Sequence, residues 1–441
     1  MLFDLLIRNG TAVTPSGRQL VDIGITAGRI AAIGNLYQAS AGESIDATGL
    51  HILPGVIDTQ VHFREPGLEH KEDLGTGTKG AILGGVTAIF EMPNTKPAAT
   101  TIELLQDKLN RAHGRAWCDY AFFIGATAEN YEQLPSLERC PGCAGVKIFM
   151  GSSTGDLLVE NDDPVLQILK HGFRRVSVHC EDEEMLRERR SLIEGGAHPR
   201  MHPEWRSPEV ALKATTRLVN LAHQAGRRIH VLHVTTAQEI EFLADHKDVA
   251  TVEVTPHHLT MAAPECYDRL GSYAQMNPPV RDEKHQAALW HGIAQSVVDV
   301  LGSDHAPHTR EEKDKPYPQS PSGMTGVQTL LPLMLNHCNN GRLSLERLVD
   351  LTSAGPARIF NISRKGRIAV GYDADLVLVD LEARRTIAND WIASRAGWTP
   401  YDGMEVQGWP LTTILRGVIA VRDGELQGSP LGTQVVFQET L

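Results

Sequence analysis

The segment Val56-Ile-Asp-Thr-Gln-Val-His-Phe-Arg64 is the most informative part of the sequence for the architecture. Residues 56–61 have the length of a strand, are too short for a typical helix, and carry apolar side chains at positions 56, 57 and 61. Gln60 and His62 lie where this strand would end. A short apolar strand with polar residues at its carboxyl end is typical of a parallel sheet that is covered by helices and carries a site at that edge.

Seven more apolar runs follow, with segments of helical periodicity between them. The runs cover residues 87–92, 121–126, 145–149, 175–178, 228–234, 249–255 and 297–302. Ala214, Leu218 and Leu221 recur at helical spacing, and Thr236-Ala-Gln-Glu239 is a capping box that marks a helix start. Eight such units over about 310 residues predict a (β/α)8 TIM barrel. A doubly wound sheet is the alternative, although no glycine-rich phosphate loop follows the first strand.

The two ends of the chain have a different sequence pattern, which predicts short strands joined by glycine-containing turns. The predicted strands cover residues 5–8, 21–26 and 29–33 near the N-terminus and 366–371 and 374–380 near the C-terminus, and residues 412–421 with Asp423-Gly424 are predicted to form a hairpin. Neither end is long enough to form a stable β domain alone. We therefore predict a small β-sandwich domain built from residues 1–53 and 365–441, and a barrel catalytic domain over residues 54–364.

Composition and charge exclude several classes of function. The chain has 441 residues, with 42 Lys and Arg against 54 Asp and Glu, and so a formal net charge of −12. An acidic balance without a basic cluster argues against a nucleic-acid or anionic-membrane partner. No apolar run approaches the ~18 residues of a membrane span. The segment Met1–Arg8 lacks the features of a signal peptide and the six cysteines are too few for a disulfide framework, so a cytoplasmic location is expected.

Unusual polar residues recur at or near the carboxyl ends of the predicted strands. They are Gln60, His62, Asn94, Lys147, His179, His233 and Asp304. In a barrel these strand ends meet at one mouth, where active sites are built. A single histidine after an apolar run is more often structural, but this many coincidences at one rim indicate a site. Imidazole and carboxylate side chains are typical ligands of zinc or a similar divalent ion.

Lys147 is the odd member of this set. An ordinary ammonium group would repel a metal ion, and the alternative interpretation is an ion-paired lysine inside the barrel. If the amine of Lys147 were carboxylated, the side chain would become an anionic bridge between two metal ions. The sequence does not display such a modification.

Four longer motifs carry a family resemblance. They are Asp58-Thr-Gln-Val-His-Phe-Arg-Glu-Pro-Gly67, Glu91-Met-Pro-Asn-Thr-Lys-Pro97, Met276-Asn-Pro-Pro-Val-Arg281 and Gly302-Ser-Asp-His-Ala-Pro-His308. Over essentially its whole length the chain closely resembles dihydroorotases of the cyclic amidohydrolase superfamily. Hydantoinases (dihydropyrimidinases) and allantoinases share the barrel and much of the metal set. The resemblance implies reversible interconversion of (S)-dihydroorotate and N-carbamoyl-L-aspartate in de novo pyrimidine (UMP) biosynthesis.

The metal set departs from the family pattern at one position. The first strand of the family usually ends in His-x-His, and here the first position is Gln60. An amide oxygen is a poorer zinc ligand than an imidazole nitrogen. The resemblance places the more buried metal ion on His62, Lys147 and Asp304, with Gln60 weak or absent as a ligand. It places the second metal ion on a complete set: Lys147, His179 and His233. We therefore expect one firmly bound zinc ion per chain, and leave open a second zinc ion and N6-carboxylation of Lys147.

The expected substrate is a small anionic molecule, which needs a cation near the metal. Arg64 lies two residues beyond His62, and its planar guanidinium suits a carboxylate. Asn94 is its expected companion, and the resemblance extends this group to Asn277 and His308. Asp304 is the candidate catalytic proton shuttle. The metal ion would activate a water molecule, which attacks the ring carbonyl as hydroxide, and Asp304 would take the proton from that water and return it to the ring nitrogen.

Three functions stay open at this point. The first is dihydroorotase, and the second is another cyclic amidase such as a hydantoinase, dihydropyrimidinase or allantoinase. The third is a non-catalytic, dihydroorotase-like partner of aspartate carbamoyltransferase, because some such chains have lost metal ligands. Arg64 separates the first two, since a neutral hydantoin needs no carboxylate clamp. Analogy with the family also predicts a homodimer.

Overall fold

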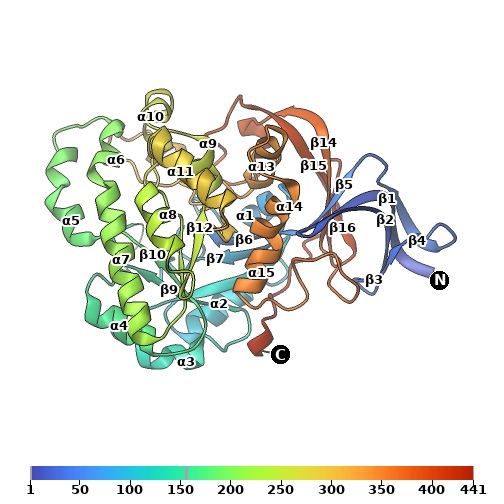
Figure 1. The fold of residues 1–441 in the computed structure, drawn as a ribbon, viewed down its shortest axis with the longest axis horizontal. Coiled ribbons are helices and arrows are strands. Elements are labelled where there is room, and N and C mark those ends of the chain that lie inside the picture. The colour runs from blue at the N-terminus through green and yellow to red at the C-terminus, as the bar shows by residue number, and fades with distance from the viewer. Residues whose placement is uncertain (1, 154–156, 441) are drawn as a thin grey trace.

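The computed structural model describes residues 2–153 and 157–440, and it contains an eight-stranded parallel sheet that forms a barrel (Figure 1). The strands are β6 (Val56–Val61), β7 (Val86–Glu91), β8 (Asp119–Gly125), β9 (Cys143–Phe149), β10 (Val176–His179), β11 (Ile229–Val231), β12 (Ala250–Val254) and β13 (Val300–Leu301). They are hydrogen-bonded in chain order from β6 to β13. Val61 pairs with His305, beyond β13, which brings the first strand against the end of the last. The predicted TIM barrel is confirmed.

Three barrel strands, β11, β12 and β13, are shorter than predicted, and the largest differences are in β11 and β13. The predicted runs over residues 228–234 and 297–302 extend past β11 and β13, which end at Val231 and Leu301. Polar residues follow at once, and two of them have left-handed backbones: φ is 38° at His233 and 46° at Asp304. A left-handed residue cannot continue a β-strand, so the chain leaves the ladder just before these side chains.

Helices surround the barrel (Figure 1). They are α1 (Leu74–Leu83), α2 (Ile102–Ala112), α3 (Leu134–Leu137), α4 (Asp162–Lys170), α5 (Glu183–Glu188), α6 (His202–Trp205), α7 (Pro208–Ala225), α8 (Ala237–Ala244), α9 (Pro256–Thr260), α10 (Glu265–Leu270), α11 (Glu283–Ala294), α12 (Arg310–Lys313), α13 (Leu330–Asn339), α14 (Leu345–Val349) and α15 (Gly355–Ile359). The predicted periodic face of α7 is buried, and Thr236 caps α8 by accepting the backbone N–H of Glu239 at 3.0 Å. None of the described helices is long and apolar enough to cross a membrane.

A second, nine-stranded sheet is built from both ends of the chain. Its strands are β1 (Leu2–Thr14), β2 (Gly17–Thr26), β3 (Arg29–Gly34), β4 (Ser40–Asp46), β5 (His51–Pro54), β14 (Leu376–Thr386), β15 (Glu405–Leu415), β16 (Val418–Arg422) and β17 (Glu425–Leu426). The two ends join at β5, which pairs parallel with β1 and antiparallel with β14. A composite β domain is therefore present, and the domain boundaries at residues 54 and 365 stay a prediction.

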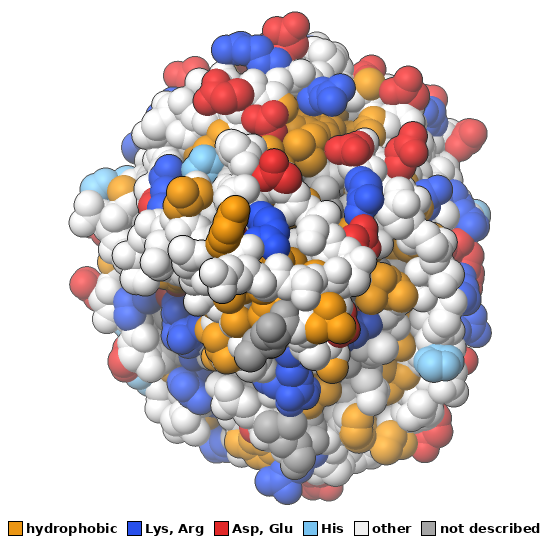
Figure 2. Space-filling model, turned by 90° about the vertical axis from the view of Figure 1, so that its right-hand side faces the viewer, with side chains coloured by type: hydrophobic (Ala, Val, Ile, Leu, Met, Phe, Trp, Pro, Cys, Tyr) orange, Lys and Arg blue, Asp and Glu red, His pale blue; other side chains and the backbone are white. Residues whose placement is uncertain are grey.

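One predicted strand of this domain is wrong. Residues 366–371 run as turns and irregular chain. Gly366 and Gly371 both have positive φ values, 79° and 88°, which break a strand at both ends of the segment. Figure 2 shows the end of the molecule that this sheet forms, and there Lys and Arg side chains are interspersed with Asp and Glu. This face is not a basic patch.

Candidate active site

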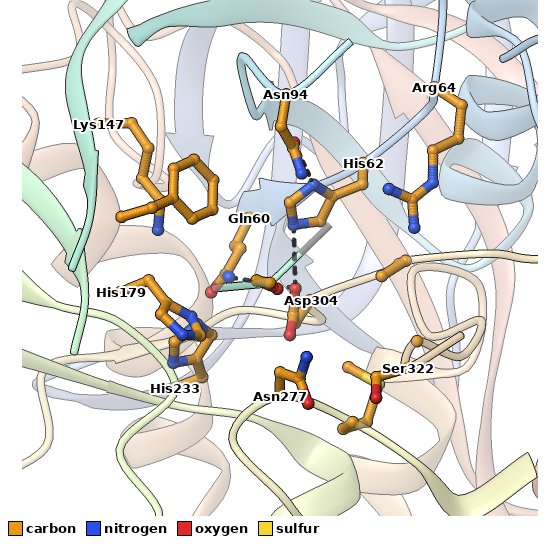
Figure 3. A pocket seen from close by; sticks show the side chains of 15 residues that line it. Gln60, His62, Arg64, Asn94, Lys147, His179, His233, Asn277, Asp304 and Ser322 are labelled. Atoms are coloured by element: carbon orange, nitrogen blue, oxygen red, sulfur yellow. Dashed lines mark hydrogen bonds and ion pairs between the residues drawn. The ribbon is translucent and has the colours of Figure 1, made fainter. Parts of the chain in front are cut away.

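A pocket at the carboxyl ends of the barrel strands gathers most of the predicted site residues (Figure 3). Nine of the ten predicted side chains line its space of about 350 Å³: Gln60, His62, Arg64, Asn94, Lys147, His179, His233, Asn277 and Asp304. The tenth, His308, lies beside Arg64, with its Nε2 atom 3.3 Å from Arg64 Nη2. Side chains that are far apart in the sequence therefore meet at the mouth of the barrel.

Unusual backbone conformations aim three of these side chains. Arg64, His233 and Asp304 have φ values of 67°, 38° and 46°. Residues with a Cβ atom rarely adopt the left-handed region, and they hold it only where the surrounding structure imposes it. All three lie two or three residues beyond the end of a barrel strand, so the turn at the strand end directs the side chain into the pocket.

One group of polar atoms centres on Asp304. His62 donates from Nδ1 to Asn94 Oδ1 at 2.7 Å, so its Nε2 carries a lone pair. That lone pair faces Asp304 Oδ1 at 3.2 Å. Gln60 Nε2 also donates to Asp304 Oδ1, at 3.1 Å. A lone pair and a carboxylate oxygen at this distance need a proton or a cation between them.

A second group centres on two histidines. His179 Nε2 donates to Glu181 Oε2 at 2.9 Å, and His179 Nδ1 faces His233 Nε2 at 3.0 Å. Lys147 lies on the same side of the pocket as this pair and extends toward it (Figure 3), with its Nζ atom 4.4 Å from the centre of the Phe149 ring. Burial alone would raise the pKa of Glu181, but Arg206 and His179 together lower it to about 2. Glu181 is therefore a carboxylate that can only accept hydrogen bonds.

Burial sets the protonation states in the pocket. It holds the pKa values of His62 and His233 well below the ordinary imidazole range and lowers that of His179. Neutral imidazole is the form that binds a metal ion. Burial also raises the pKa of Asp304 to about 7, with a further contribution from the charge of Glu253, and lowers the pKa of Lys147 to about 7.

These residues fit a divalent metal ion, although the fit depends on more than histidines and carboxylates. In residues 2–153 and 157–440, no three His, Cys, Asp or Glu side chains form a ready-made cluster. The donors form two facing pairs instead, with Lys147 and Gln60 beside them. Nitrogens that share a tetrahedral zinc at 2.0–2.1 Å lie ~3.3 Å apart, close to the spacing of the His179–His233 pair. Gln60 Oε1 is buried and has no hydrogen-bond partner among the described residues.

Arg64 supplies a cation to the same pocket. Its side chain is buried, Nε donates to the Pro307 carbonyl oxygen at 3.2 Å, and Nη1 has no hydrogen-bond partner among the described residues. Burial lowers the pKa of Arg64 to about 10, so the guanidinium stays charged at neutral pH. A buried charged donor without a partner is costly, and an anionic ligand would satisfy it.

The structure adds residues that the sequence did not single out. Asn277 Oδ1 accepts a hydrogen bond from His202 Nε2 at 3.0 Å. His202 belongs to the short helix α6 in the long connection between β10 and β11, where no periodic pattern marks it. Glu181 could have been predicted from the sequence. It lies two residues beyond His179, and residues at that spacing share a side of an extended chain.

Asp58 precedes the pocket residue Gln60 in β6, and its titration tests how strongly burial shifts the pKa of an acid in the barrel. It is fully buried, and its Oδ1 accepts the backbone N–H groups of Gln60 and Ser303 at 3.2 and 2.9 Å. Burial raises its pKa to about 7. Between about pH 4 and that value the native state keeps a proton that the unfolded chain has lost, so the free energy of unfolding falls as pH rises.

Asp58→Asn keeps an oxygen that accepts both N–H groups, and it removes the titration. In the wild type, titration of Asp58 should lower the free energy of unfolding by up to roughly 4 kcal/mol between about pH 4 and pH 7. We expect this contribution to be absent in the variant. Urea unfolding of both proteins across this range measures the difference. Equal pH dependence in the two proteins would show that Asp58 does not titrate as its burial requires.

Comparisons with known proteins agree with this geometry. The model of the Amidohydrolase family matches residues 51–420. The chain is 36% identical over 421 residues to a dihydroorotase from Halobacterium salinarum, covering 94% of this chain and 96% of that protein. It is 33% identical to an allantoinase from Deinococcus radiodurans, covering 98% of each. An L-hydantoinase (dihydropyrimidinase) from Arthrobacter aurescens superposes with a TM-score of 0.93 at 30% identity, covering 98% of this chain and 99% of that chain. The chain therefore belongs to the amidohydrolase family.

Proposed function

We propose that this cyclic amidohydrolase is a zinc-dependent dihydroorotase that interconverts (S)-dihydroorotate and N-carbamoyl-L-aspartate in pyrimidine biosynthesis. The observation that carries the choice of substrate is Arg64, a buried guanidinium that lines the pocket with Nη1 unpartnered among the described residues. Dihydroorotate has a ring carboxylate for this cation, whereas hydantoin and allantoin rings do not. The sequence similarity to a dihydroorotase from Halobacterium salinarum supports the same choice.

The metal chemistry follows from the donor set. Amidohydrolases are generally metal-dependent. In our proposal His179, His233 and Lys147 hold one zinc ion, and zinc supplies an activated water and polarises the ring carbonyl when it is bound. Burial lowers the pKa of Lys147 to about 7, which favours the neutral amine, and a neutral amine can take up carbon dioxide and release a proton to give the anionic, carboxylated side chain.

The remaining chemistry belongs to side chains of the pocket. Asp304 has a pKa of about 7, close to the pH at which it would act. A carboxyl group with such a pKa can accept a proton from the attacking water and return it to the ring nitrogen that leaves. Gln60 holds its Oδ1 atom in place by donating a hydrogen bond from Nε2. Arg64, with His308 beside it and Asn94 and Asn277 in the same pocket, would bind the substrate carboxylate and orient the ring.

Gln60 predicts the number of metal ions. The amide replaces an imidazole ligand of the family pattern, and its Nε2 is engaged with Asp304. We expect about one zinc per chain in the wild-type protein and about two in Gln60→His, because the variant adds an imidazole ligand beside His62. Elemental analysis of the purified proteins measures this, with Gln60→Met as a control of similar size. Two zinc ions in the wild type, or no gain in Gln60→His, would contradict the assignment.

A comparison of substrates tests the proposed function. The zinc-loaded protein should have a kcat/KM for dihydroorotate at least about 100-fold above those for dihydrouracil and allantoin, because each neutral ring leaves Arg64 unpaired. Preference for a neutral ring would favour the second candidate, another cyclic amidase. That candidate has its own support in the likeness to an allantoinase and to an L-hydantoinase.

The assembly of the protein stays a prediction. We propose a homodimer, and light scattering of the purified protein measures it. Association with aspartate carbamoyltransferase would make the third candidate, a non-catalytic partner, testable. Binding of that enzyme by a chain that turns over no ring substrate with zinc present, and that still assembles when His179 and His233 are replaced, would favour it.

A further inference from the structure

We propose that Glu181 is a positioning residue that holds the proton of His179 on Nε2 and so leaves Nδ1 free to bind the metal ion. The inference rests on the proposed metal dependence of the pocket. It assigns a role to a side chain that does not itself line the pocket. It also explains why a fully buried acidic residue lies directly behind one of the two facing histidines.

The contact between Glu181 and His179 carries the argument. Glu181 Oε2 lies 2.9 Å from His179 Nε2, and both side chains are buried. A carboxylate oxygen only accepts hydrogen bonds. His179 must therefore donate from Nε2, and because a neutral imidazole carries one N–H, its Nδ1 holds a lone pair. The ring is fixed in one tautomer and one orientation.

Arg206 keeps Glu181 in the acceptor state. Its guanidinium is buried and forms a close ion pair with the same Oε2 atom of Glu181. Arg206 is itself held, because Nη2 donates to the Ser152 carbonyl oxygen at 2.7 Å and its own carbonyl oxygen accepts from Arg281 Nη1 at 2.9 Å. The carboxylate is thus placed between a histidine and an anchored cation, and it cannot turn away from His179 without breaking an ion pair.

In the part of the chain that the structure describes, His233, the other histidine of the pair, has no carboxylate that fixes its tautomer. His233 Nδ1 is buried and has no hydrogen-bond partner among the described residues. His233 Nε2 faces the lone pair of His179 at 3.0 Å. Within the described chain, the order of this pair of rings therefore depends on Glu181. Carboxylates that orient metal-binding histidines in this way typically change metal affinity 10–100-fold when they are removed.

Three variants separate positioning from general stability. We expect Glu181→Ala to weaken zinc binding about 10–100-fold, as measured by competition with a chelating dye. Glu181→Gln should fall in the same range, because an amide can donate as well as accept and no longer imposes one tautomer. Glu183→Gln is the matched control. It makes the same change of charge two residues away, at a side chain that accepts the Ser152 N–H at 2.6 Å, and it should stay within about twofold of wild type.

A second measurement reads the tautomer directly in the metal-free protein. Nitrogen-15 NMR of histidine-labelled wild type should show His179 as the Nε2–H tautomer, with its signals assigned by comparison with His179→Gln. In Glu181→Gln the signals should shift toward a mixture of tautomers. This readout does not depend on activity or on a bound metal ion, and a merely structural role of Glu181 would not move it.

The outcomes are distinct. Unchanged zinc affinity in both Glu181 variants, or a wild-type His179 that carries its proton on Nδ1, would overturn the inference. If the variants do not fold, the wild-type NMR spectrum still decides. If the wild type binds no zinc while His179 shows the Nε2–H tautomer, the proposed function fails and the positioning of His179 stands.

Discussion

Arg64→Met is expected to lower kcat/KM for dihydroorotate by about 100- to 1000-fold and to change hydrolysis of dihydrouracil by less than about threefold. The reason is that Arg64 lines the pocket and that Nη1 of its buried guanidinium has no hydrogen-bond partner among the described residues. Loss of a desolvated charge pair with a substrate carboxylate costs about 3–4 kcal/mol, which corresponds to that range of rates. Steady-state kinetics with both substrates on the same protein preparation measures the effect.

Arg64→Lys is the control for charge without the planar fork. It should recover part of the activity toward dihydroorotate, because a lysine can supply one charged hydrogen bond where arginine supplies two. An equal loss toward both substrates in Arg64→Met would mean that Arg64 maintains the pocket, where it also donates to the Pro307 carbonyl oxygen. The choice of dihydroorotate as substrate would then lose its main support.

Asp304→Asn is expected to lower kcat by about 100- to 10,000-fold for every ring substrate, with a much smaller change in KM. The amide keeps the shape of the side chain and can still contact Gln60 and His62, but it cannot accept and return a proton. The same exchange at Asp58 is a matched control, because Asp58 is also a buried acid with a pKa of about 7 and does not line the pocket. Asp58→Asn should keep kcat within a few-fold of wild type.

Zinc content belongs to this experiment. If Asp304→Asn loses its zinc, the fall in kcat reports on metal binding, so kinetics must be compared at equal zinc per chain. A zinc-loaded Asp304→Asn with a wild-type kcat would contradict the role of proton shuttle and would direct attention to other groups of the pocket.

The barrel could be predicted from sequence because its signal is local. Most barrel strands are short runs rich in apolar residues, and a polar side chain such as His62 or His179 lies at the end where parallel strands meet. That rule places residues at one mouth without any knowledge of their contacts. It succeeds even for His233 and Asp304, which lie beyond the strands on left-handed turns.

The rest depends on contacts that the sequence does not display. The orientation of His179 comes from Glu181 and Arg206. These two residues form an ion pair because the long connection between β10 and β11 brings Arg206 back to Glu181. The nine-stranded sheet depends on β5, whose four residues, His51–Pro54, pair with strands from both ends of the chain. Residues 366–371 have the composition of a strand, but the left-handed glycines at both ends make them a turn. In each case tertiary contacts or backbone geometry outweigh the local pattern.

The most direct measurement is the turnover of dihydroorotate to N-carbamoyl-L-aspartate by the purified protein, with zinc counted per chain in the same sample. We predict turnover with about one zinc per chain, loss of turnover after removal of zinc by a chelator, and recovery when zinc is returned. Absence of turnover in protein that holds zinc would contradict the account.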